Sequence, residues 1–238
     1  KGAAESYAWQ VAPAVPIAAG PGGRGFPWHI LITFDGEDPQ QVLQNNGRHL
    51  FIFPLQYYKE LYQGAGRSMI DDQAGRLREL IDQGQNRLQT PEGAVPLLPP
   101  ASGSANRWAQ YRVLDFTDGS GVRYLSDTPD RQAVGVWSNE TTAYTYQGLT
   151  DDGRYYISLW WPVRTDALPE TADLAAQEIK ARAVDPLTNP AYIRETAALL
   201  DALNPADFTP RLSQLDALVK SLTIGSAPEP APETSDQS

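Results

Sequence analysis

Two turn signals in the middle of the chain constrain its fold more than any other feature. The first is the stretch 118–121 (DGSG) and the second is 150–153 (TDDG), and each separates two segments rich in apolar and aromatic residues. Glycine can take the positive φ that a tight hairpin demands, and Asp side chains satisfy nearby backbone donors in turns. The sequence therefore predicts two antiparallel β-hairpins. Their strands are expected at 107–116, 122–126, 143–149 and 154–161.

Two short apolar runs near the N-terminus predict two further strands, at 29–34 and 49–53, each followed by turn-forming residues or proline. A short helix is expected over 54–62, with Pro54 at its first position. Apolar residues then recur at helical spacing over 70–81, which predicts an amphipathic helix. Two acidic residues are placed to favour the N-terminus of that helix: Asp71 and Asp72.

The C-terminal third has the pattern of helices, at 170–183, 189–203 and 209–222. Asn-Pro and Thr-Pro dipeptides mark the start of the second and third helices. The last residues of this region, 221–224, are compatible with a short strand. Hairpins followed by helices, without βαβ alternation, predict an α+β fold: an antiparallel β-sheet built from hairpins, flanked by amphipathic helices, with a C-terminal helical block.

Composition divides the chain into three parts. Residues 1–25 are rich in Ala, Pro and Gly and are expected to form a flexible N-terminal segment. Residues 26–225 are expected to form a single α+β domain, within which the Pro-rich stretch 90–104 is a long connection that is neither helix nor central strand. Residues 226–238 contain too little apolar surface to fold and are expected to be a disordered Pro-rich, acidic tail.

Composition also excludes several classes of function. The 238 residues carry a formal net charge of −10 and include no Cys. Without thiols there is no disulfide framework, thiolate metal site or cysteine nucleophile. The negative charge repels phosphate backbones, so we expect no nucleic-acid partner. No stretch approaches the roughly 20 apolar residues of a membrane-spanning helix, and the motifs of zinc proteases and of nucleotide- or NAD-binding sites are missing from the sequence.

Several segments carry a resemblance to known proteins: residues 29–35 (HILITFD), 51–58 (FIFPLQYY), 115–125 (DFTDGSGVRYL), 144–158 (YTYQGLTDDGRYYIS), 162–169 (PVRTDALP) and 208–224 (FTPRLSQLDALVKSLTI). In these segments the chain resembles a family of secreted or lipid-anchored bacterial proteins of unassigned function. A more distant similarity, in the strand YYISL and the late helix ending LVKSLTI, is to the PsbP/Mog1-like fold. Proteins of that group act mainly in binding or assembly, so the resemblance implies a non-catalytic role by analogy.

Aromatic side chains are the first candidates for a binding surface. Successive residues of a strand emerge on opposite faces of a sheet, so some aromatic residues of the hairpins are expected on a solvent-facing side. There they would stack on sugar rings or anchor a partner protein. The alternative is that the C-terminal helices cover this face. The candidate ligand-binding residues are Tyr144, Tyr146, Tyr156 and Trp160.

Carboxylates are the second group of candidates, because calcium prefers oxygen ligands from side chains and loop carbonyls. One cluster follows the first predicted strand and another precedes the first hairpin turn, although neither has EF-hand spacing. The alternative is that these acids serve the turns in which they lie. The candidate calcium ligands are Asp35, Glu37, Asp38, Asp115 and Asp118. No other cofactor is expected.

Two functions of different class follow. The first is a non-catalytic extracytoplasmic binding or assembly module that contacts a protein or glycan partner in the cell envelope through an aromatic-rich sheet face. The second is a carboxylate-based hydrolase that acts on envelope or extracellular polymers. The two histidines, His29 and His49, open predicted strands and are expected to close hydrogen bonds rather than perform chemistry.

The expected location rests on the first residues and on the missing thiols. The chain begins at Lys1 without an initiator Met and its opening carries little charge, which is compatible with a removed leader. We therefore expect an extracytoplasmic protein that is secreted, periplasmic or membrane-anchored.

Overall fold

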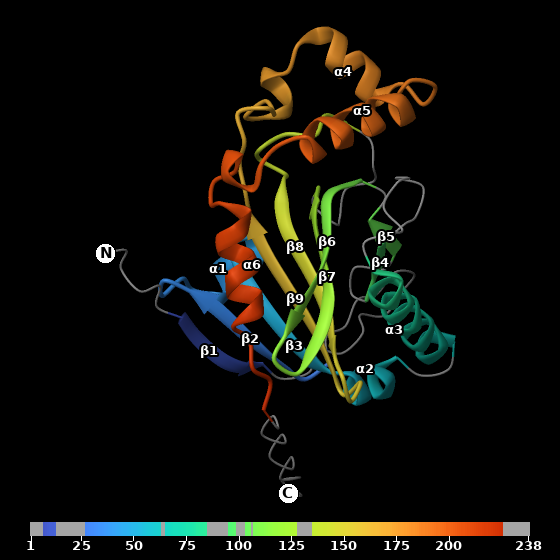
Figure 1. Ribbon diagram of the computed structural model, residues 1–238, viewed down its shortest axis with the longest axis vertical. Helices are drawn as coiled ribbons and strands as arrows, with labels where there is room; N and C mark the ends of the chain where they lie inside the picture. Colours follow the sequence, from blue (N-terminus) through green and yellow to red (C-terminus); the bar gives the residue numbers. More distant parts are fainter. Residues whose placement is uncertain are drawn as a thin grey trace, which may run out of the picture.

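A seven-stranded antiparallel sheet forms the centre of the protein, with helices on both of its faces (Figure 1). This arrangement confirms the predicted α+β fold with hairpins and a C-terminal helical block. In spatial order the strands are β1 (Tyr7–Ala12), β2 (His29–Phe34), β3 (His49–Pro54), β9 (Tyr155–Pro162), β8 (Ala143–Thr150), β7 (Gly119–Ser126) and β6 (Trp108–Phe116). The computed structural model describes residues 7–12, 27–62, 65–84, 95–98, 103–105, 107–127 and 135–225.

Both predicted hairpins are present, as β6–β7 and β8–β9. In the second hairpin Gly153 has a φ of +68°, as the turn was expected to require. In the first hairpin the explanation is different, because Gly119 and Gly121 lie inside β7. A Cβ at Gly121 would meet the backbone of Gln147 and Gly148 on the neighbouring strand β8. These glycines therefore permit the close approach of two strands. The prediction that they are needed for a positive φ is wrong.

The N-terminal strands extend the sheet beyond the hairpins. β3 pairs with β9 in antiparallel register from His49–Trp160 to Pro54–Tyr155, and β2 pairs with β3. β1 pairs with β2 at the edge of the sheet. The assignment of residues 1–25 to a flexible segment is therefore wrong for Tyr7–Ala12, whose backbone is held by strand pairing. The remaining residues of that segment, and the predicted tail 226–238, lie outside the described residues.

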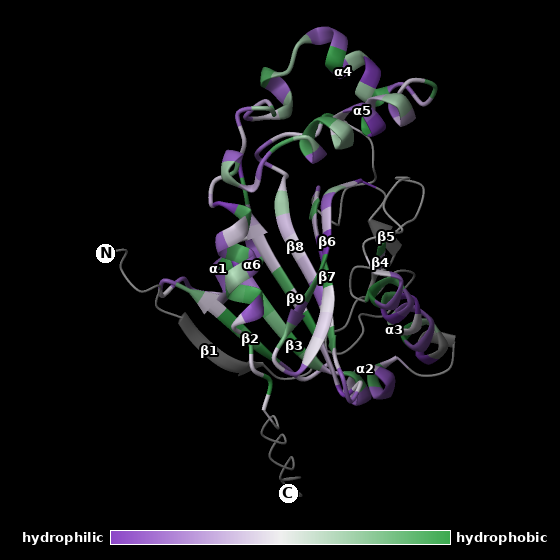
Figure 2. Cartoon of the chain, in the orientation of Figure 1, coloured by the Kyte–Doolittle hydropathy of each residue, from purple (hydrophilic) through white to green (hydrophobic). Residues whose placement is uncertain are grey.

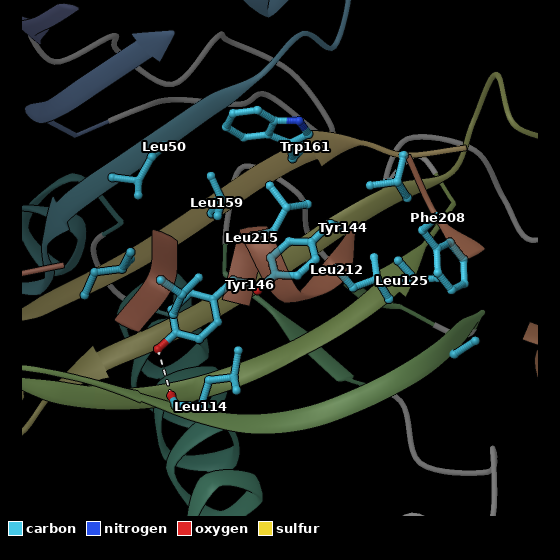
Figure 3. Close-up of a cluster of buried hydrophobic side chains, with 14 of the residues drawn as sticks. Leu50, Leu114, Leu125, Tyr144, Tyr146, Leu159, Trp161, Phe208, Leu212 and Leu215 are labelled. Carbon is cyan, nitrogen blue, oxygen red and sulfur yellow. Dashed lines mark hydrogen bonds between the residues drawn. The ribbon is translucent and has the colours of Figure 1, made fainter. Parts of the chain in front are cut away.

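One face of the sheet packs against α6 (Leu212–Lys220), the last helix of the chain. Figure 3 shows Leu212 and Leu215 of α6 beside Tyr144 and Tyr146 of β8. The Tyr146 hydroxyl, which would otherwise be a buried unpaired group, donates to the Leu114 carbonyl oxygen at 3.2 Å. The alternate residues of β9 that face this core are Tyr155, Ile157, Leu159 and Trp161, as the alternation predicts.

The other face packs against α2 (Leu55–Leu61) and α3 (Ala65–Gln83), with Tyr58, Ile70 and Leu77 almost fully buried. Both helices were predicted, but α3 begins several residues earlier than expected. Asp71 is consequently in the body of α3, where it forms an ion pair with Lys59 of α2. The predicted role of Asp71 and Asp72 at the helix N-terminus is therefore wrong.

The remaining elements are short or lie at the ends of the sheet. Asp38 accepts hydrogen bonds from the first amides of α1 (Pro39–Gln44), a helix that the sequence pattern did not predict. In the predicted helix over 170–183, the α-helix begins only at Gln177, after a 3₁₀ turn. The elements not yet given, in chain order, are β4 (Val95–Leu97), β5 (Gly103–Ala105), η2 (Ala172–Leu174), α4 (Gln177–Val184), α5 (Asn189–Asp201) and η3 (Pro205–Asp207).

After α6 the chain runs back to the β6–β7 turn without forming a strand. The Leu222 carbonyl accepts a hydrogen bond from the Thr117 amide at 3.2 Å. The Ile224 amide donates to the Asp118 carboxylate at 2.7 Å. The predicted strand over 221–224 is therefore wrong, because a turn and a side chain, not a neighbouring strand, satisfy its backbone groups.

A buried ion pair attaches α6 to the sheet. Arg123 of β7 is fully buried, and its Nε and Nη2 atoms each donate to the Asp216 carboxylate at 3.1 Å. The Tyr144 hydroxyl donates to the same carboxylate at 3.0 Å, and Arg123 also donates to the Gln110 carbonyl. This bidentate geometry is the strong form of a carboxylate–guanidinium contact, and it sets how α6 lies on the sheet.

A β-bulge attaches the end of α5 to the sheet edge. Gln110 takes a φ of +55°, and the register of β6 shifts around it. The Gln110 side-chain amide donates to the carbonyls of Leu200 at 2.7 Å and Leu203 at 2.9 Å, and its backbone amide donates to Asp201. The carbonyls of Leu200 and Leu203, at and just beyond the end of α5, therefore receive a donor from a strand in addition to the local bond that Leu200 accepts from the Leu203 amide.

Replacing Gly121 with Ala is expected to destabilise the protein by about 1–3 kcal/mol, because the added methyl group overpacks the β7–β8 contact. The matched control is Gly75→Ala in α3, where nothing lies within 4 Å of the new Cβ. There alanine is expected to stabilise the helix by about 0.5–1 kcal/mol. Urea unfolding measures both changes, and an unchanged free energy of unfolding for Gly121→Ala would contradict the steric requirement.

Replacing Asp216 with Ala is expected to cost about 3–5 kcal/mol of unfolding free energy, because Arg123 is left charged and buried without its partner. The control is Glu195→Ala, which breaks the solvent-exposed ion pair with Arg182 and is expected to leave the thermal midpoint nearly unchanged. Differential scanning calorimetry compares the two variants. Equal effects would show that burial does not distinguish these ion pairs.

Candidate functional site

The four predicted aromatic ligand-binding residues are buried in the folded protein. Tyr144 and Tyr146 are 0% exposed, Tyr156 is 4% exposed and Trp160 is 7% exposed. α6 covers the first two, as the alternative reading of the sequence expected, but the Tyr156 side is covered by α2 and α3, which precede the hairpins. The predicted solvent-facing aromatic surface is therefore wrong, because both faces of the sheet are packed against helices.

Hydrogen bonds and, for the three tyrosines, pKa shifts agree with a structural role for these four side chains. The Tyr156 hydroxyl donates to Gln147 Oε1 at 2.7 Å, and the Trp160 indole donates to the Asn46 carbonyl at 3.1 Å. Burial raises the pKa of Tyr144, Tyr146 and Tyr156 well above the usual value of a phenol. These hydroxyls therefore stay protonated and act as hydrogen-bond donors in the core.

The first predicted calcium cluster is engaged by the protein itself. Arg48 forms ion pairs with Asp35 at 2.7 Å and with Glu37 at 2.5 Å. The Asp38 carboxylate accepts the amides of Gln40 and Gln41 at 3.0 Å and so caps α1. The structure therefore brings Asp35 and Glu37 together around a guanidinium.

The second predicted calcium cluster lies at the opposite end of the sheet. Asp118 is in the β6–β7 turn, where it accepts the Ile224 amide, and Asp115 is exposed on β6. Within the described ranges, no three His, Asp or Glu side chains are placed to hold a metal ion. Calcium binding by either cluster remains a prediction.

A hollow of about 320 Å³ lies between the turns of the two hairpins and the chain after α6. Asp152 accepts hydrogen bonds from the Thr150 hydroxyl at 2.6 Å and the Arg154 amide at 2.9 Å, and these bonds lower its pKa. Asp152 is therefore held as an anion within its own turn. The residues that line the hollow are Thr117, Asp118, Thr150, Asp151, Asp152, Arg154, Tyr155, Ile224 and Gly225.

Both histidines form the hydrogen bonds expected of them and stay away from this hollow. The Nδ1 atom of His29 lies 2.8 Å from the Pro27 carbonyl, and that of His49 lies 2.8 Å from the Gly47 carbonyl. Because a carbonyl only accepts, Nδ1 is the protonated nitrogen of each ring. Burial lowers the pKa of both histidines, and that of His49 falls to about 4.

Exposed apolar side chains gather on a part of the protein that sequence analysis did not select. We call residues 172–201, which comprise η2, α4 and α5, the helical extension; it lies beyond one end of the sheet (Figure 1). Leu187 is 89% exposed, Leu174 is 71% exposed and Val184 is 56% exposed. Figure 2 shows hydrophobic residues interspersed with hydrophilic ones along α4 and α5. Such a concentration of exposed large apolar residues is typical of a contact surface.

The local sequence explains why Leu187 is exposed. It lies in the tight turn between α4 and α5, where its amide donates to the Asp185 carboxylate at 2.9 Å. Because this turn lies outside both helices, Leu187 does not belong to the buried side of either helix. The signal in the sequence was a large apolar residue within a proline-containing turn, outside the helical periodicity.

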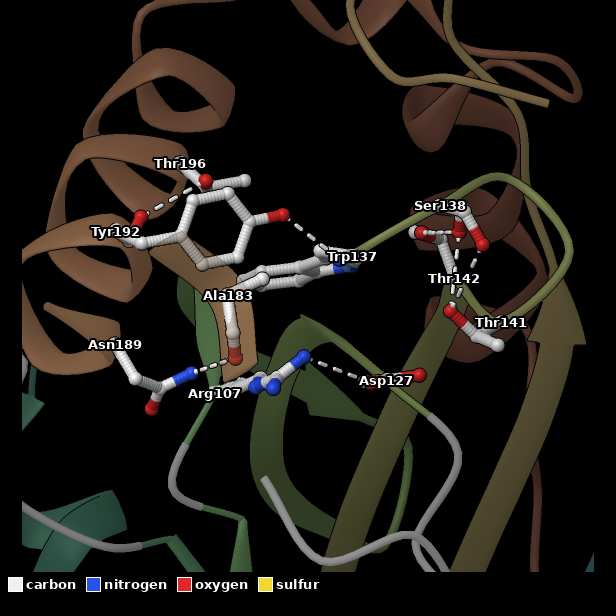
Figure 4. A network of polar contacts seen from close by, with 10 residues as sticks. All are labelled: Arg107, Asp127, Trp137, Ser138, Thr141, Thr142, Ala183, Asn189, Tyr192 and Thr196. Carbon is white, nitrogen blue, oxygen red and sulfur yellow. Dashed lines mark hydrogen bonds and ion pairs between the residues drawn. The ribbon is translucent and has the colours of Figure 1, made fainter. Parts of the chain in front are cut away.

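The helical extension is attached to the sheet by the network in Figure 4. The Trp137 amide donates to the Tyr192 hydroxyl at 2.8 Å. The Ala183 carbonyl accepts the Gly135 amide at 3.1 Å and the Asn189 side-chain amide at 2.6 Å. A small apolar cluster, separate from the two sheet cores, completes the attachment; its buried members are Val136, Ala175, Ala183 and Tyr192.

Comparison with known proteins identifies no relative. No protein-family model, curated protein or solved structure matches the chain. The resemblance to secreted or lipid-anchored bacterial proteins and to the PsbP/Mog1-like fold therefore remains a prediction from the sequence. Among the helices that the structure describes, none is long and apolar enough to cross a bilayer.

The low pKa of His49 predicts a loss of stability in mild acid. Because this pKa is about 4 in the folded protein and about 6.5 in the unfolded chain, the unfolded chain binds the proton more readily. The stabilising contribution is complete above pH 6.5 and is lost as the pH falls toward 4, with a total of about 3 kcal/mol.

Urea unfolding of wild type and His49→Gln across this pH range tests the prediction. Gln retains a side-chain donor for the Gly47 carbonyl but does not titrate. The difference between the two curves isolates His49, since His29 and the carboxylates contribute equally to both. Parallel curves from pH 7 to pH 4 would show that His49 does not control this stability.

Proposed function

We propose that this protein is a non-catalytic binding module and that the helical extension is its partner-binding element. The observation that carries the proposal is the exposure of Leu187, Leu174 and Val184 on one projecting part of the fold. Fully burying an aliphatic side chain of this size contributes about 1.5–3 kcal/mol. A partner that covers these residues would gain most of its affinity from them.

The chemistry of this surface favours a protein partner with an apolar groove. Glycan recognition relies on flat aromatic rings, and the aromatic residues of the hairpins are buried. The large exposed residues of the helical extension are instead aliphatic, and charged residues such as Lys180 and Glu195 lie on the same helices. An apolar centre with a polar rim is the common composition of protein interfaces.

The hydrolase alternative has weaker support. A glycosidase acid needs a raised pKa so that it carries a proton at working pH. Asp152, in the hollow that Asp118 and Asp151 also line, has a lowered pKa instead. The extracytoplasmic location also remains part of the proposal, and it rests on the sequence alone.

Site-specific photo-crosslinking tests the proposed surface. A photoreactive amino acid at position 187, introduced into the protein in its native host, is expected to form one discrete adduct. The same amino acid in place of Glu79, an exposed residue on α3, is expected to form none.

A matched variant makes this test specific. Leu174→Asp combined with Val184→Asp should abolish the adduct from position 187, because charged side chains cannot be buried in an apolar groove. The thermal midpoint should stay unchanged, because both residues are largely exposed. An adduct that survives this double substitution, or an equal adduct from position 79, would contradict the proposed interface.

A further inference from the structure

A buried cation with unused hydrogen-bond donors lies at the base of the helical extension. Arg107, immediately before β6, is only 4% exposed. Its Nη1 atom donates to Asp127 Oδ2 at 3.2 Å. Its Nε and Nη2 atoms have no hydrogen-bond partner among the described residues. Arginine is rarely buried in this state, because each unpaired donor loses its hydration without compensation.

A third unused donor belongs to the same network. Trp137 is fully buried, and its indole Nε1 has no partner within the described part of the chain. Tyr192 of α5 belongs to this network as well, because its hydroxyl accepts a hydrogen bond from the Trp137 amide at 2.8 Å. Figure 4 shows all three around the contact between the sheet and the helical extension. These three nitrogens are the only unpaired buried side-chain donors among the described residues.

The geometry of a guanidinium identifies the chemistry that such donors recognise. The Nε–H and Nη2–H bonds lie along one edge of the guanidinium plane, and they point in parallel. That edge matches the two oxygens of a carboxylate. By comparison, Arg123 uses the same two nitrogens to hold the Asp216 carboxylate in the core.

Charge and space define the ligand further. Asp127 already balances the charge of Arg107, so a singly charged anion is favoured over a doubly charged phosphate. Because Arg107 is only 4% exposed, we expect the group that reaches its free edge to be small. We propose that the free edge of Arg107 binds a carboxylate at the base of the helical extension. This inference is independent of the proposed interface, since it rests on buried donors and not on exposed apolar residues.

The carboxylate has two possible sources, and the experiment separates them. Acetate represents a free small acid, and a tripeptide with a free C-terminus represents a peptide carboxylate. The same tripeptide with an amidated C-terminus is the control for the second source. Sodium chloride at matched ionic strength is the control for general salt effects.

Nitrogen-15 NMR of the full chain reports directly on the donors. Titration with acetate or the free tripeptide should shift the Arg107 Nε–H and Trp137 Nε1–H resonances saturably, while the Arg182 Nε–H resonance stays in place. Loss of the response with the amidated peptide identifies the carboxylate as the bound group. No shift up to about 100 mM of either probe, or equal shifts with chloride, would overturn the proposal.

Two variants change the affinity in opposite directions. Arg107→Lys keeps the positive charge but removes the paired donors, and it should weaken carboxylate binding at least about tenfold. Asp127→Asn removes the competing negative charge and should tighten binding several-fold. A general loss of structure would weaken binding in both variants, so tighter binding by Asp127→Asn separates a ligand site from a merely structural ion pair. Unchanged affinity in both variants would also overturn the proposal.

Discussion

The pairing of β3 with β9 is the contact on which the rest of the structure depends. It joins the N-terminal strands to the central hairpins through residues that are far apart in sequence, from 101 positions between Pro54 and Tyr155 to 111 between His49 and Trp160. Once this pairing forms, β9 is an interior strand with neighbours on both sides. The side chains of β9 alternate between the two faces of the sheet, so both faces must be buried. α6 packs on one face, and α2 and α3 pack on the other.

This double covering determines which surfaces are available for function. The aromatic residues that would serve a binding face are used to build the two cores, and their hydroxyls form internal hydrogen bonds. The acidic turns at one end of the sheet are similarly engaged, with Asp118 and Asp152 holding backbone amides. The exposed apolar side chains and the unpaired buried donors lie at the other end of the sheet. There the helical extension exposes aliphatic residues and packs near Arg107.

The helical extension and the Arg107 network combine two kinds of chemistry at one place in the fold. Apolar residues at the α4–α5 turn are suited to contact with another protein, whereas the unused donors beneath are suited to a small anion. Burial lowers the pKa of Arg107, and Asp127 opposes this effect. An additional carboxylate would act in the same direction as Asp127, by favouring the charged guanidinium.

The sequence by itself determined the elements whose signals are local. The hairpins around Gly119 and Gly153, the strands at His29 and His49, and the C-terminal helices follow from turn residues, apolar period and proline position. Tertiary structure decided which faces were covered, because burial of Tyr156 depends on α2 and α3, which are distant from it in sequence. It also decided the partners of charged groups: Asp216 meets Arg123, and Arg48 takes Asp35 and Glu37. Periodicity specifies which residues share a face, but only the packing of the whole chain specifies what lies against that face.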